Sequence, residues 1–340
     1  MSHHHDHQPA PGLLDVHCHV VPVDLPVDPT GGKLALWPQM HCDGGHTASF
    51  VAGGVTRKFD DRSWLPGRRI DYMDEHGIGM QVLSPLPELF GYWFEPSATA
   101  VLCRHVNDTI AAMVESAPTR FAGLGSLPMN DPALAISEAR RLKTLGFAGV
   151  EIGSNVNGVS PADPRHAEVL ACAHDLGLSV FVHGVRPAVE GRLVGPEVLG
   201  PIVGIPMDTA LCVAAFIGGR VLERLPNLRV AFSHGGGGIG AVLDRFQHVW
   251  NVMPDLKKAL PDRPLEEARR FWYDILTFSP DYTRYLIQTL GPDRLFVGTD
   301  FPAGGMGLMD PAAFLAELRL PKDNHERIAY RNARAFLGFS

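Results

Sequence analysis

Short apolar segments rich in Val, Ile, Leu and Phe alternate along this chain with longer segments in which hydrophobic residues recur at helical spacing. This alternation is the pattern expected of repeated strand–helix units. Eight segments qualify as strands, with predicted ends at His19, Pro85, Leu127, Gly153, Gly184, Gly235, Leu276 and Pro302.

Helical patterns lie between these segments, for example at residues 97–115, 132–145, 164–176, 208–225 and 239–250. Asp131-Pro132 and Asp163-Pro164 each place a capping Asp before a Pro suited to the first helical turn. Eight such units predict an α/β protein with a closed (β/α)8 barrel of the TIM type. An open doubly wound sheet is the alternative, but it would require a topological break that the pattern does not contain.

Two segments do not follow the repeat. Residues 22–65 contain several Gly-Gly pairs and prolines, which predict a small insertion of hairpins and loops after the first strand. Residues 184–206 predict a long loop on the same rim. We therefore expect a single barrel domain over residues 12–340 and a disordered tail over residues 1–11, whose histidines we exclude from the site.

Composition limits the classes of partner. The chain has 340 residues, of which 45% are hydrophobic and 20% charged, as in ordinary globular proteins. Its formal net charge is -7, and no run of basic residues could follow a phosphate backbone. We expect no nucleic-acid partner.

The five cysteines form no Cys-x-x-Cys pair, which argues against disulfides and a thiolate zinc site. The N-terminus lacks the features of a signal peptide, and no apolar segment approaches the roughly 20 residues of a membrane span. We expect a soluble cytoplasmic protein without a membrane partner.

Side chains that bind metals stand at several of the predicted strand ends. His17 and His19 point to the same face because side chains in a strand alternate. His183 and Asp300 end two other strands, and a parallel barrel brings all strand ends to one rim. Taken singly, His183 would be a satisfied core histidine and Asp300 a helix cap. Taken together, the four residues offer a metal ion three nitrogen ligands and one oxygen ligand.

This ligand set suits zinc best, with iron, cobalt or manganese as alternatives, and leaves a position for water or substrate. Asp15, in an otherwise apolar strand, offers an acceptor for the second ring nitrogen of a ligand histidine. Glu151 stands where two-metal barrels carry a bridging lysine, so we expect one ion. A metal-bound water has a pKa near about 7, which supplies hydroxide without a strong base.

His234 ends the sixth strand and is the candidate for general acid/base chemistry. It could instead be a further metal ligand or a cap of the turn formed by residues 235–238. This glycine run lacks the Lys-Ser/Thr of a nucleotide loop, so close backbone approach explains it better.

These residues and an ordered set of further motifs resemble the metal-dependent amidohydrolase superfamily, most closely its aminocarboxymuconate semialdehyde decarboxylase group. The resemblance covers nearly the whole chain. Besides His-x-His, the motifs are Arg69-Ile70-Asp71-Tyr72-Met73-Asp74, Gln81-Val82-Leu83-Ser84, Tyr92-Trp93, Arg120-Phe121-Ala122-Gly123-Leu124-Gly125, Leu127-Pro128-Met129, Phe181-Val182-His183, Ser233-His234-Gly235-Gly236-Gly237 and Gly298-Thr299-Asp300.

The resemblance implies a zinc ion held by His17, His19, His183 and Asp300, with His234 acting on the metal-bound water. It also implies that Arg57 binds a substrate carboxylate. Arg245, eleven positions after His234, matches an arginine that the family inserts into the neighbouring subunit's site, which implies a homodimer. On sequence alone, either arginine would more often be a solvated surface charge.

The chain departs from the family at positions that line the substrate. Gly184-Val185 replaces Pro-Trp, Pro201 and Ala303 stand at aromatic positions, and Val51 stands at a lysine position. These differences affect the expected substrate rather than the reaction class.

The resemblance and the site together predict a metal-dependent, non-oxidative decarboxylase of a small unsaturated or aromatic carboxylic acid, in which Asp300 relays a proton as well as binding metal. The alternatives are a metal-dependent hydrolase of a lactone, amide or imine, and a non-catalytic barrel with a structural metal. An open coordination position beside His234 argues against the last, because structural zinc sites are normally closed.

Overall fold

Eight parallel strands form one sheet in the order β1-β5-β6-β7-β8-β9-β10-β11 in this computed structural model, which describes residues 12–53, 55–187, 192–302 and 309–339. The predicted N-terminal tail lies outside the described residues. The barrel strands are β1 (Leu13–Val20), β5 (Ile78–Pro85), β6 (Phe121–Ser126), β7 (Gly149–Gly153), β8 (Ser179–His183), β9 (Val230–Phe232), β10 (Trp272–Asp274) and β11 (Leu295–Phe296).

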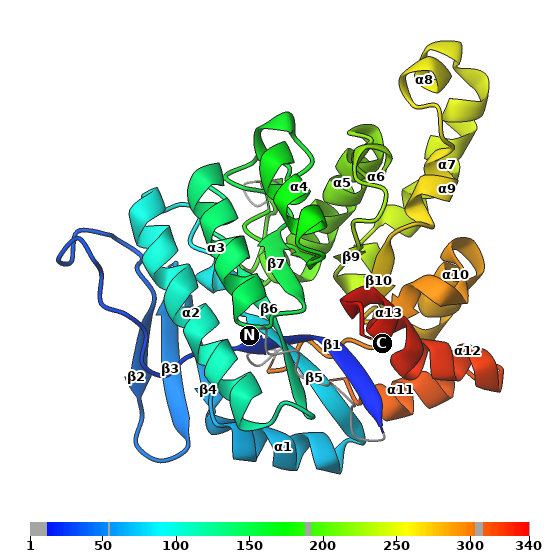
Figure 1. Cartoon of the computed structure of the whole chain (residues 1–340). Helices are drawn as coiled ribbons and strands as arrows, with labels where there is room; N and C mark the ends of the chain where they lie inside the picture. Colours follow the sequence, from blue (N-terminus) through cyan, green and yellow to red (C-terminus); the bar gives the residue numbers. More distant parts are fainter. Residues whose placement is uncertain (1–11, 54, 188–191, 303–308, 340) are drawn as a thin grey trace.

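Backbone hydrogen bonds join β1, at one end of this strand order, to the residues that directly follow β11, at the other end. The amide of Val16 in β1 donates to the carbonyl of Val297 (3.0 Å), and the amide of Thr299 donates to the carbonyl of His17 (3.1 Å). The sheet therefore closes on itself. Figure 1 shows helices arranged around its strands. The predicted (β/α)8 barrel is confirmed, and the open doubly wound alternative is wrong.

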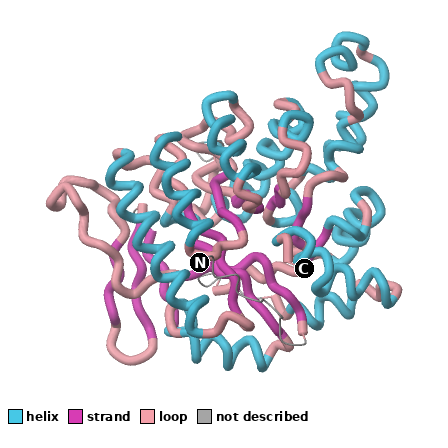
Figure 2. The backbone as a smooth tube through the Cα atoms, viewed as in Figure 1, coloured by secondary structure: helices cyan, strands magenta, loops and turns pink. Residues whose placement is uncertain are grey.

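Helices cover the outside of the barrel between successive strands (Figure 2). The longer ones are α1 (Pro66–Glu75), α2 (Pro96–Ser116), α3 (Pro132–Thr144), α4 (Ala167–Asp175), α5 (Ile205–Gly218), α7 (Ile239–Val252) and α10 (Pro280–Leu290). Shorter ones are α6 (Val221–Arg224), α8 (Pro254–Ala259), α9 (Pro264–Ala268), α11 (Pro311–Glu317), α12 (Lys322–Glu326), α13 (Asn332–Leu337), η1 (Asp61–Ser63), η2 (Pro87–Leu89), η3 (Pro164–His166), η5 (Gly200–Gly204), η6 (His234–Gly236), η7 (Pro292–Arg294) and η9 (Arg327–Arg331).

The predicted helix starts at two Asp-Pro pairs are confirmed. The Asp131 carboxylate accepts a hydrogen bond from the amide of Leu134, and Asp163 accepts one from the amide of Arg165. Each bond satisfies an amide that has no partner within the first helical turn.

A three-stranded antiparallel sheet lies between β1 and β5 in the chain, at the left of Figure 1. Its strands are β2 (Gln39–Cys42), β3 (Thr47–Ala52) and β4 (Val55–Asp60). One face of β3 is buried, because Ala48, Phe50 and Ala52 are each at most 5% exposed. We propose that residues 22–65 form an insertion in one barrel domain.

The segment from Gly184 to Pro206, expected to be a loop, is partly helical. Residues 200–204 form η5, which continues directly into α5. The resulting helix, residues 200–218, contains an 18-residue window with a mean hydropathy of 1.7 and is long and apolar enough for a membrane span, contrary to expectation. Core helices pass the same test, and Cys212, Val213 and Phe216 pack into the hydrophobic core of the barrel.

A charged network lies buried beside β1. The Arg69 guanidinium donates to Oε1 of Gln81 (2.8 Å) and to the carbonyl of His19 (2.8 Å), and it stacks 4.7 Å from the Phe301 ring. Gln81 in turn donates to Asp15 (2.9 Å). Arg69 and Asp15 are both fully buried, so each charge depends on this network.

Replacing Arg69 with Leu should lower the free energy of unfolding by about 3–5 kcal/mol, because Asp15 would remain buried without its positive partner. The exposed neighbour Arg68 provides the control, and Arg68→Leu should change stability by less than about 1 kcal/mol. Urea unfolding followed by circular dichroism measures both. Equal losses for the two variants would contradict the role of the buried network.

Candidate metal centre

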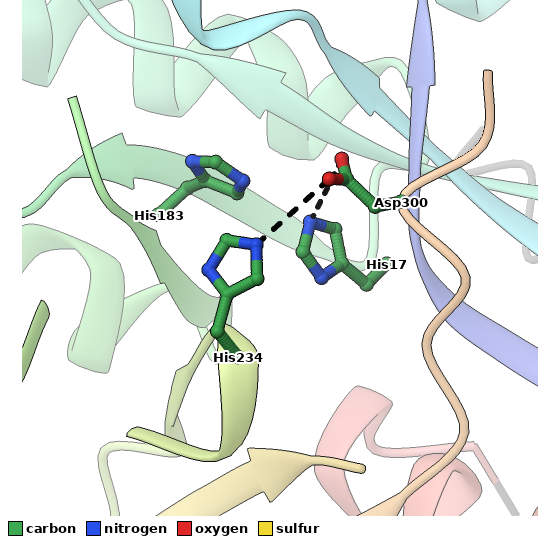
Figure 3. A group of neighbouring side chains, drawn as sticks. All are labelled: His17, His183, His234 and Asp300. Carbon is green, nitrogen blue, oxygen red and sulfur yellow. Dashed lines mark ion pairs between the residues drawn. The ribbon is translucent and has the colours of Figure 1, made fainter. Parts of the chain in front are cut away.

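The carboxyl ends of four barrel strands bring the predicted site residues to one rim. His17 and His19 lie in β1, His183 ends β8, His234 follows β9 in η6, and Asp300 follows β11. Figure 3 shows four of these side chains pointing toward one another. The rim is where barrels of this kind carry their chemistry.

A register shift in β1 turns its two histidines into the barrel. Asp15 pairs with Gln81 and Cys18 with Leu83, so two residues of β1 lie opposite a single residue of β5. Such a bulge reverses the alternation of side chains beyond it. Val16 belongs to a cluster of buried residues that draws on most of the barrel strands, whereas Cys18 packs in the larger cluster with residues of the surrounding helices.

The imidazoles stand close to one another around the Asp300 carboxylate. The His17 ring centroid is 5.2, 4.9 and 5.2 Å from those of His19, His183 and His234. Oδ1 of Asp300 lies 2.9 Å from Nε2 of His19 and 3.5 Å from Nε2 of His17. Oδ2 lies 3.8 Å from Nε2 of His234.

One potential ligand atom from each of His17, His183, His234 and Asp300 lies within 4.8 Å of the other three. This geometric group contains His234 in place of His19. His19 nevertheless faces the same carboxylate, so all five predicted side chains meet at one place.

Hydrogen bonds at Nδ1 orient three of the four imidazoles, so that each Nδ1–H points away from the centre. The acceptors are the Asp274 carboxylate for His17 (2.6 Å), the Pro85 carbonyl for His19 (3.0 Å) and the Gly184 carbonyl for His183 (2.7 Å).

This arrangement directs Nε2 of each of the three rings inward, where Nε2 of His19 lies 2.9 Å from Oδ1 of Asp300. Among the described residues, Nε2 of His17 and Nε2 of His183 are buried without a hydrogen-bond partner. Buried polar atoms of this kind require a partner, and an inward lone pair on a ring fixed through its other nitrogen is the form in which histidine binds metal. The donor set therefore fits a divalent ion.

Electrostatics favour the ionisation states that a cation requires. Burial lowers the pKa of His17, and it lowers the pKa of His183 well below the ordinary value, with neighbouring imidazoles adding to the effect. Burial alone would raise the pKa of Asp300, but the hydrogen bond with His19 and the nearby rings of His234 and His17 hold it well below its usual range. Two neutral imidazoles and an ionised carboxylate result, which matches what metal binding needs.

Burial also acts to lower the pKa of His19, but the hydrogen bond to Asp300 and the charges of Glu151 and Glu88 outweigh it, so the pKa is raised. Glu151 is fully buried, and Oε2 lies 4.0 Å from Nδ1 of His19. Burial raises the pKa of Glu151 to about 8.

Asp274 is a site residue that the sequence analysis missed. Its carboxylate is fully buried and accepts from the ring of His17, from the amide of His234 (2.9 Å) and from the amide of Gly235 (2.9 Å). It thus fixes two of the histidines at once. An acidic residue at the end of an otherwise apolar strand was the available signal.

Asp15 is likewise an acidic residue in an otherwise apolar strand. Its predicted role as an acceptor for a histidine ring is wrong. Its carboxylate accepts from Thr299 Oγ1 (2.7 Å), from the Thr299 amide (3.1 Å) and from Gln81. Asp15 therefore holds the segment that leads to Asp300, rather than an imidazole.

Two glycines allow the close approaches that the site needs. A Cβ at Gly298 would lie 2.7 Å from Cβ of His17 and 2.9 Å from Cβ of Asp274. A Cβ at Gly237 would lie 1.8 Å from the carbonyl oxygen of Pro206. The glycine run after His234 thus reflects close backbone packing, as predicted.

The two predicted substrate-binding arginines lie in different places. Arg57, in β4, has its Nη2 2.7 Å from Oε1 of Glu88, an acidic partner that the sequence analysis missed. Arg245 is exposed on α7.

Four of the five positions that depart from the family pattern lie among the described residues. Gly184 and Val185 are buried after β8, and a Cβ at Gly184 would lie 2.5 Å from Cγ2 of Ile205. Pro201 lies in η5 and Val51 in β3. Ala303 falls outside the described residues.

A family model described as "Amidohydrolase" matches residues 14–339. The chain belongs to this family, as the motifs indicated.

Curated relatives support a narrower class of enzyme within this family, the decarboxylases. A 2-amino-3-carboxymuconate-6-semialdehyde decarboxylase of Dictyostelium discoideum is 34% identical over 96% of this chain and 91% of its own length. A gamma-resorcylate decarboxylase of Rhodococcus jostii is 28% identical over 75% of this chain and 83% of its own length. The predicted resemblance and the predicted enzyme class, a decarboxylase of this family, are confirmed.

Solved structures share the fold. A 5-carboxyvanillate decarboxylase of Sphingomonas paucimobilis superposes with a TM-score of 0.78, at 23% identity over 97% of this chain and all of that one. A dihydroxybenzoic acid decarboxylase of a Polaromonas species, determined with bound manganese and 2-nitroresorcinol, gives a TM-score of 0.77 at 21% identity over 96% of this chain and 97% of that one.

Asp274→Asn should weaken divalent metal binding by about 10- to 100-fold, because the amide cannot replace both accepting oxygens that orient His17 and His234. Metal content after dialysis against graded chelator measures the affinity. Asp262→Asn, at an exposed carboxylate, is the control and should bind metal like the unaltered chain. Equal metal affinity in both variants would contradict the orienting role.

Proposed function

We propose that this chain is a metal-dependent, non-oxidative decarboxylase of a small unsaturated or aromatic carboxylic acid. The observation that carries the proposal is the set of imidazoles whose Nδ1–H groups are anchored outward around an ionised carboxylate. His17, His19, His183 and Asp300 would hold one divalent ion. Three nitrogens and one oxygen favour zinc, with manganese, iron or cobalt as alternatives.

A bound divalent ion supplies a Lewis acid and lowers the pKa of coordinated water. The remaining chemistry is assigned to the chain itself. Decarboxylation breaks the bond between the carboxyl carbon and its neighbour, and the neighbouring carbon needs a proton when carbon dioxide leaves.

His234 is suited to moving that proton. Its Nδ1 is buried without a hydrogen-bond partner among the described side chains and backbone groups, unlike the Nδ1 atoms of the three proposed ligand histidines. Its Nε2 faces Oδ2 of Asp300 at 3.8 Å. A ring whose tautomer is not fixed by an acceptor can take up a proton at one step and release it at another, and Asp300 can relay it.

The backbone holds His234 firmly while leaving its ring unanchored. Its amide donates to Asp274, and its φ of 55° lies in the left-handed region that non-glycine residues rarely adopt. Such conformations persist where the surrounding structure enforces them, often at functional sites. His234 is therefore assigned the acid/base role rather than that of a ligand.

His234→Gln should lower kcat by about 10²- to 10⁴-fold while metal content stays unchanged, since proton transfer is lost but the proposed ligands remain. Carbon dioxide release from a panel of aromatic and unsaturated acids measures the rate, and elemental analysis measures the metal. His174→Gln, remote from the site, serves as the control. Full activity of His234→Gln would remove the residue from the reaction, and loss of metal would make it a ligand.

Substrate carboxylates would be bound by Arg57 and by Arg245 of a second subunit in a homodimer. Arg245 is exposed on α7, and it is accompanied by exposed apolar side chains on α5 and α7. Met207, Leu211 and Val242 are 41%, 58% and 47% exposed. An apolar surface of this kind beside a charged residue supports an interface. We assign the protein to the cytoplasm, without a nucleic-acid or membrane partner.

If the protein is a homodimer with shared sites, two inactive variants should restore activity to each other when they are combined. If Arg245 completes the partner's site, subunits with His234→Gln and subunits with Arg245→Ala form mixed dimers in which one of two sites is intact. Random mixing should therefore recover about a quarter of the unaltered activity. The rate is measured after co-expression of both variants. No recovery, with dimers demonstrated by light scattering, would contradict the shared site.

A further inference from the structure

Three buried residues near the rim form a hydrogen-bonded group that has no part in the chemistry proposed so far. Ser154 and Asn155 follow β7, and Asp208 lies in the first turn of α5. Their side chains belong to residues that are 2%, 8% and 4% exposed. Oδ2 of Asp208 accepts hydrogen bonds from Oγ of Ser154 and from Nδ2 of Asn155, the second at 2.8 Å. We call these three residues the Asp208 network.

The Asp208 network holds the segment that directly follows β8. The amide of Ser154 donates to the carbonyl of His183 (2.7 Å), and Oγ of Ser154 accepts from the amide of Val185 (3.2 Å). Nδ2 of Asn155 donates to the carbonyl of Val185 (2.8 Å). Both backbone polar groups of Val185 are thus satisfied by side chains of the network, as buried backbone groups require.

This segment also carries the acceptor that orients a proposed metal ligand. Nδ1 of His183 donates to the carbonyl of Gly184 (2.7 Å). That carbonyl and the amide of Val185 belong to one planar peptide group, so the hydrogen bond from Val185 to Ser154 fixes the direction of the carbonyl. The ring of His183 is therefore linked to Asp208 through one peptide plane and one hydroxyl group.

The glycine at position 184 makes such anchoring necessary. Glycine has more backbone freedom than any other residue, whereas the proline of the family pattern would fix φ at this position. A Cβ at Gly184 would lie 2.5 Å from Cγ2 of Ile205 and 2.8 Å from its carbonyl oxygen, so a larger residue does not fit beside α5 without a shift. The neighbours of the segment must therefore hold its conformation.

We propose that Asp208 is a positioning residue for the metal centre, which acts through Ser154 and the peptide group between Gly184 and Val185 to set the orientation of the His183 ring. This inference rests on the proposed function, because it takes His183 as a metal ligand. Asp208 itself is not one of the proposed ligands.

A purely structural role for the network makes a different prediction. If Asp208 only joined α5 to the barrel, its loss would lower stability and leave metal binding unchanged. Asn107 offers a matched control, because it is also buried and bonds to the amide and the carbonyl of Ser126. Ser126 ends β6, a strand that carries no proposed ligand.

The test measures Co²⁺ binding by the full chain. Competition with graded chelator gives the affinity, visible absorption of the bound Co²⁺ reports its coordination geometry, and urea unfolding at saturating Co²⁺ gives the stability. Ser154→Ala and Asp208→Ala should each weaken Co²⁺ binding by about tenfold and alter the absorption spectrum, because the His183 ring loses its fixed direction. Asp208→Asn keeps one acceptor oxygen for both hydrogen bonds and should retain most of the affinity.

Asn107→Ala should lose stability while its Co²⁺ affinity and spectrum stay those of the unaltered chain. Unchanged affinity and spectrum in Ser154→Ala would overturn the inference, even if stability fell. Should Asp208→Ala fail to fold, Ser154→Ala still decides, because it removes a single hydroxyl group.

His183→Ala tests the proposed metal centre separately. If this variant binds Co²⁺ as the unaltered chain does, His183 is not a ligand, and the proposed centre and the inference both fail. If His183→Ala loses Co²⁺ but Ser154→Ala binds it normally, the proposed centre stands and the positioning role of Asp208 is contradicted.

Discussion

The site depends on a single constraint, which is that the proposed ligand imidazoles donate their Nδ1–H outward to fixed acceptors. The acceptors are a buried carboxylate and two backbone carbonyls, and all three belong to barrel strands or to the residues that follow them. Because the scaffold fixes each ring through one nitrogen, the other nitrogen points to a common centre without any further adjustment. His234 differs in lacking such an acceptor among the described residues, and on this difference rests the proposal that it carries a proton rather than binding metal.

Burying charged groups at this centre is costly, and the surrounding network offsets the cost. Asp274 accepts four hydrogen bonds, from the ring of His17 and from three backbone amides. Asp15 is tied through Gln81 to the buried guanidinium of Arg69. Even so, burial raises the pKa of Asp15 to about 6. Asp274 and Asp15 can therefore be buried close together, since each has its own hydrogen-bond donors.

The barrel and the rim serve different purposes. The strands and helices position the histidines and Asp300, while the inserted sheet and the segments after the strands carry the residues that would meet a substrate. Figure 1 shows the inserted sheet at one side of the barrel and α8 at the end of an arm beyond α7. Arg57 and Arg245 both lie on these peripheral elements. Substrate preference can thus change without disturbing the centre, which fits a family whose named members act on several different acids.

The sequence by itself determined the barrel, most of its strand ends and the residues that converge on the centre, because strand periodicity is local and parallel strands bring their carboxyl ends together. Only the tertiary structure decided which side chains form hydrogen bonds and ion pairs with one another. Asp274 meets His17 across 257 positions of the chain, Asp15 binds Thr299 instead of an imidazole, and Glu88 pairs with Arg57. These contacts depend on the closure of the barrel and on a bulge in β1. Local periodicity cannot reveal either feature, because each arises from the packing of strands that are distant in sequence.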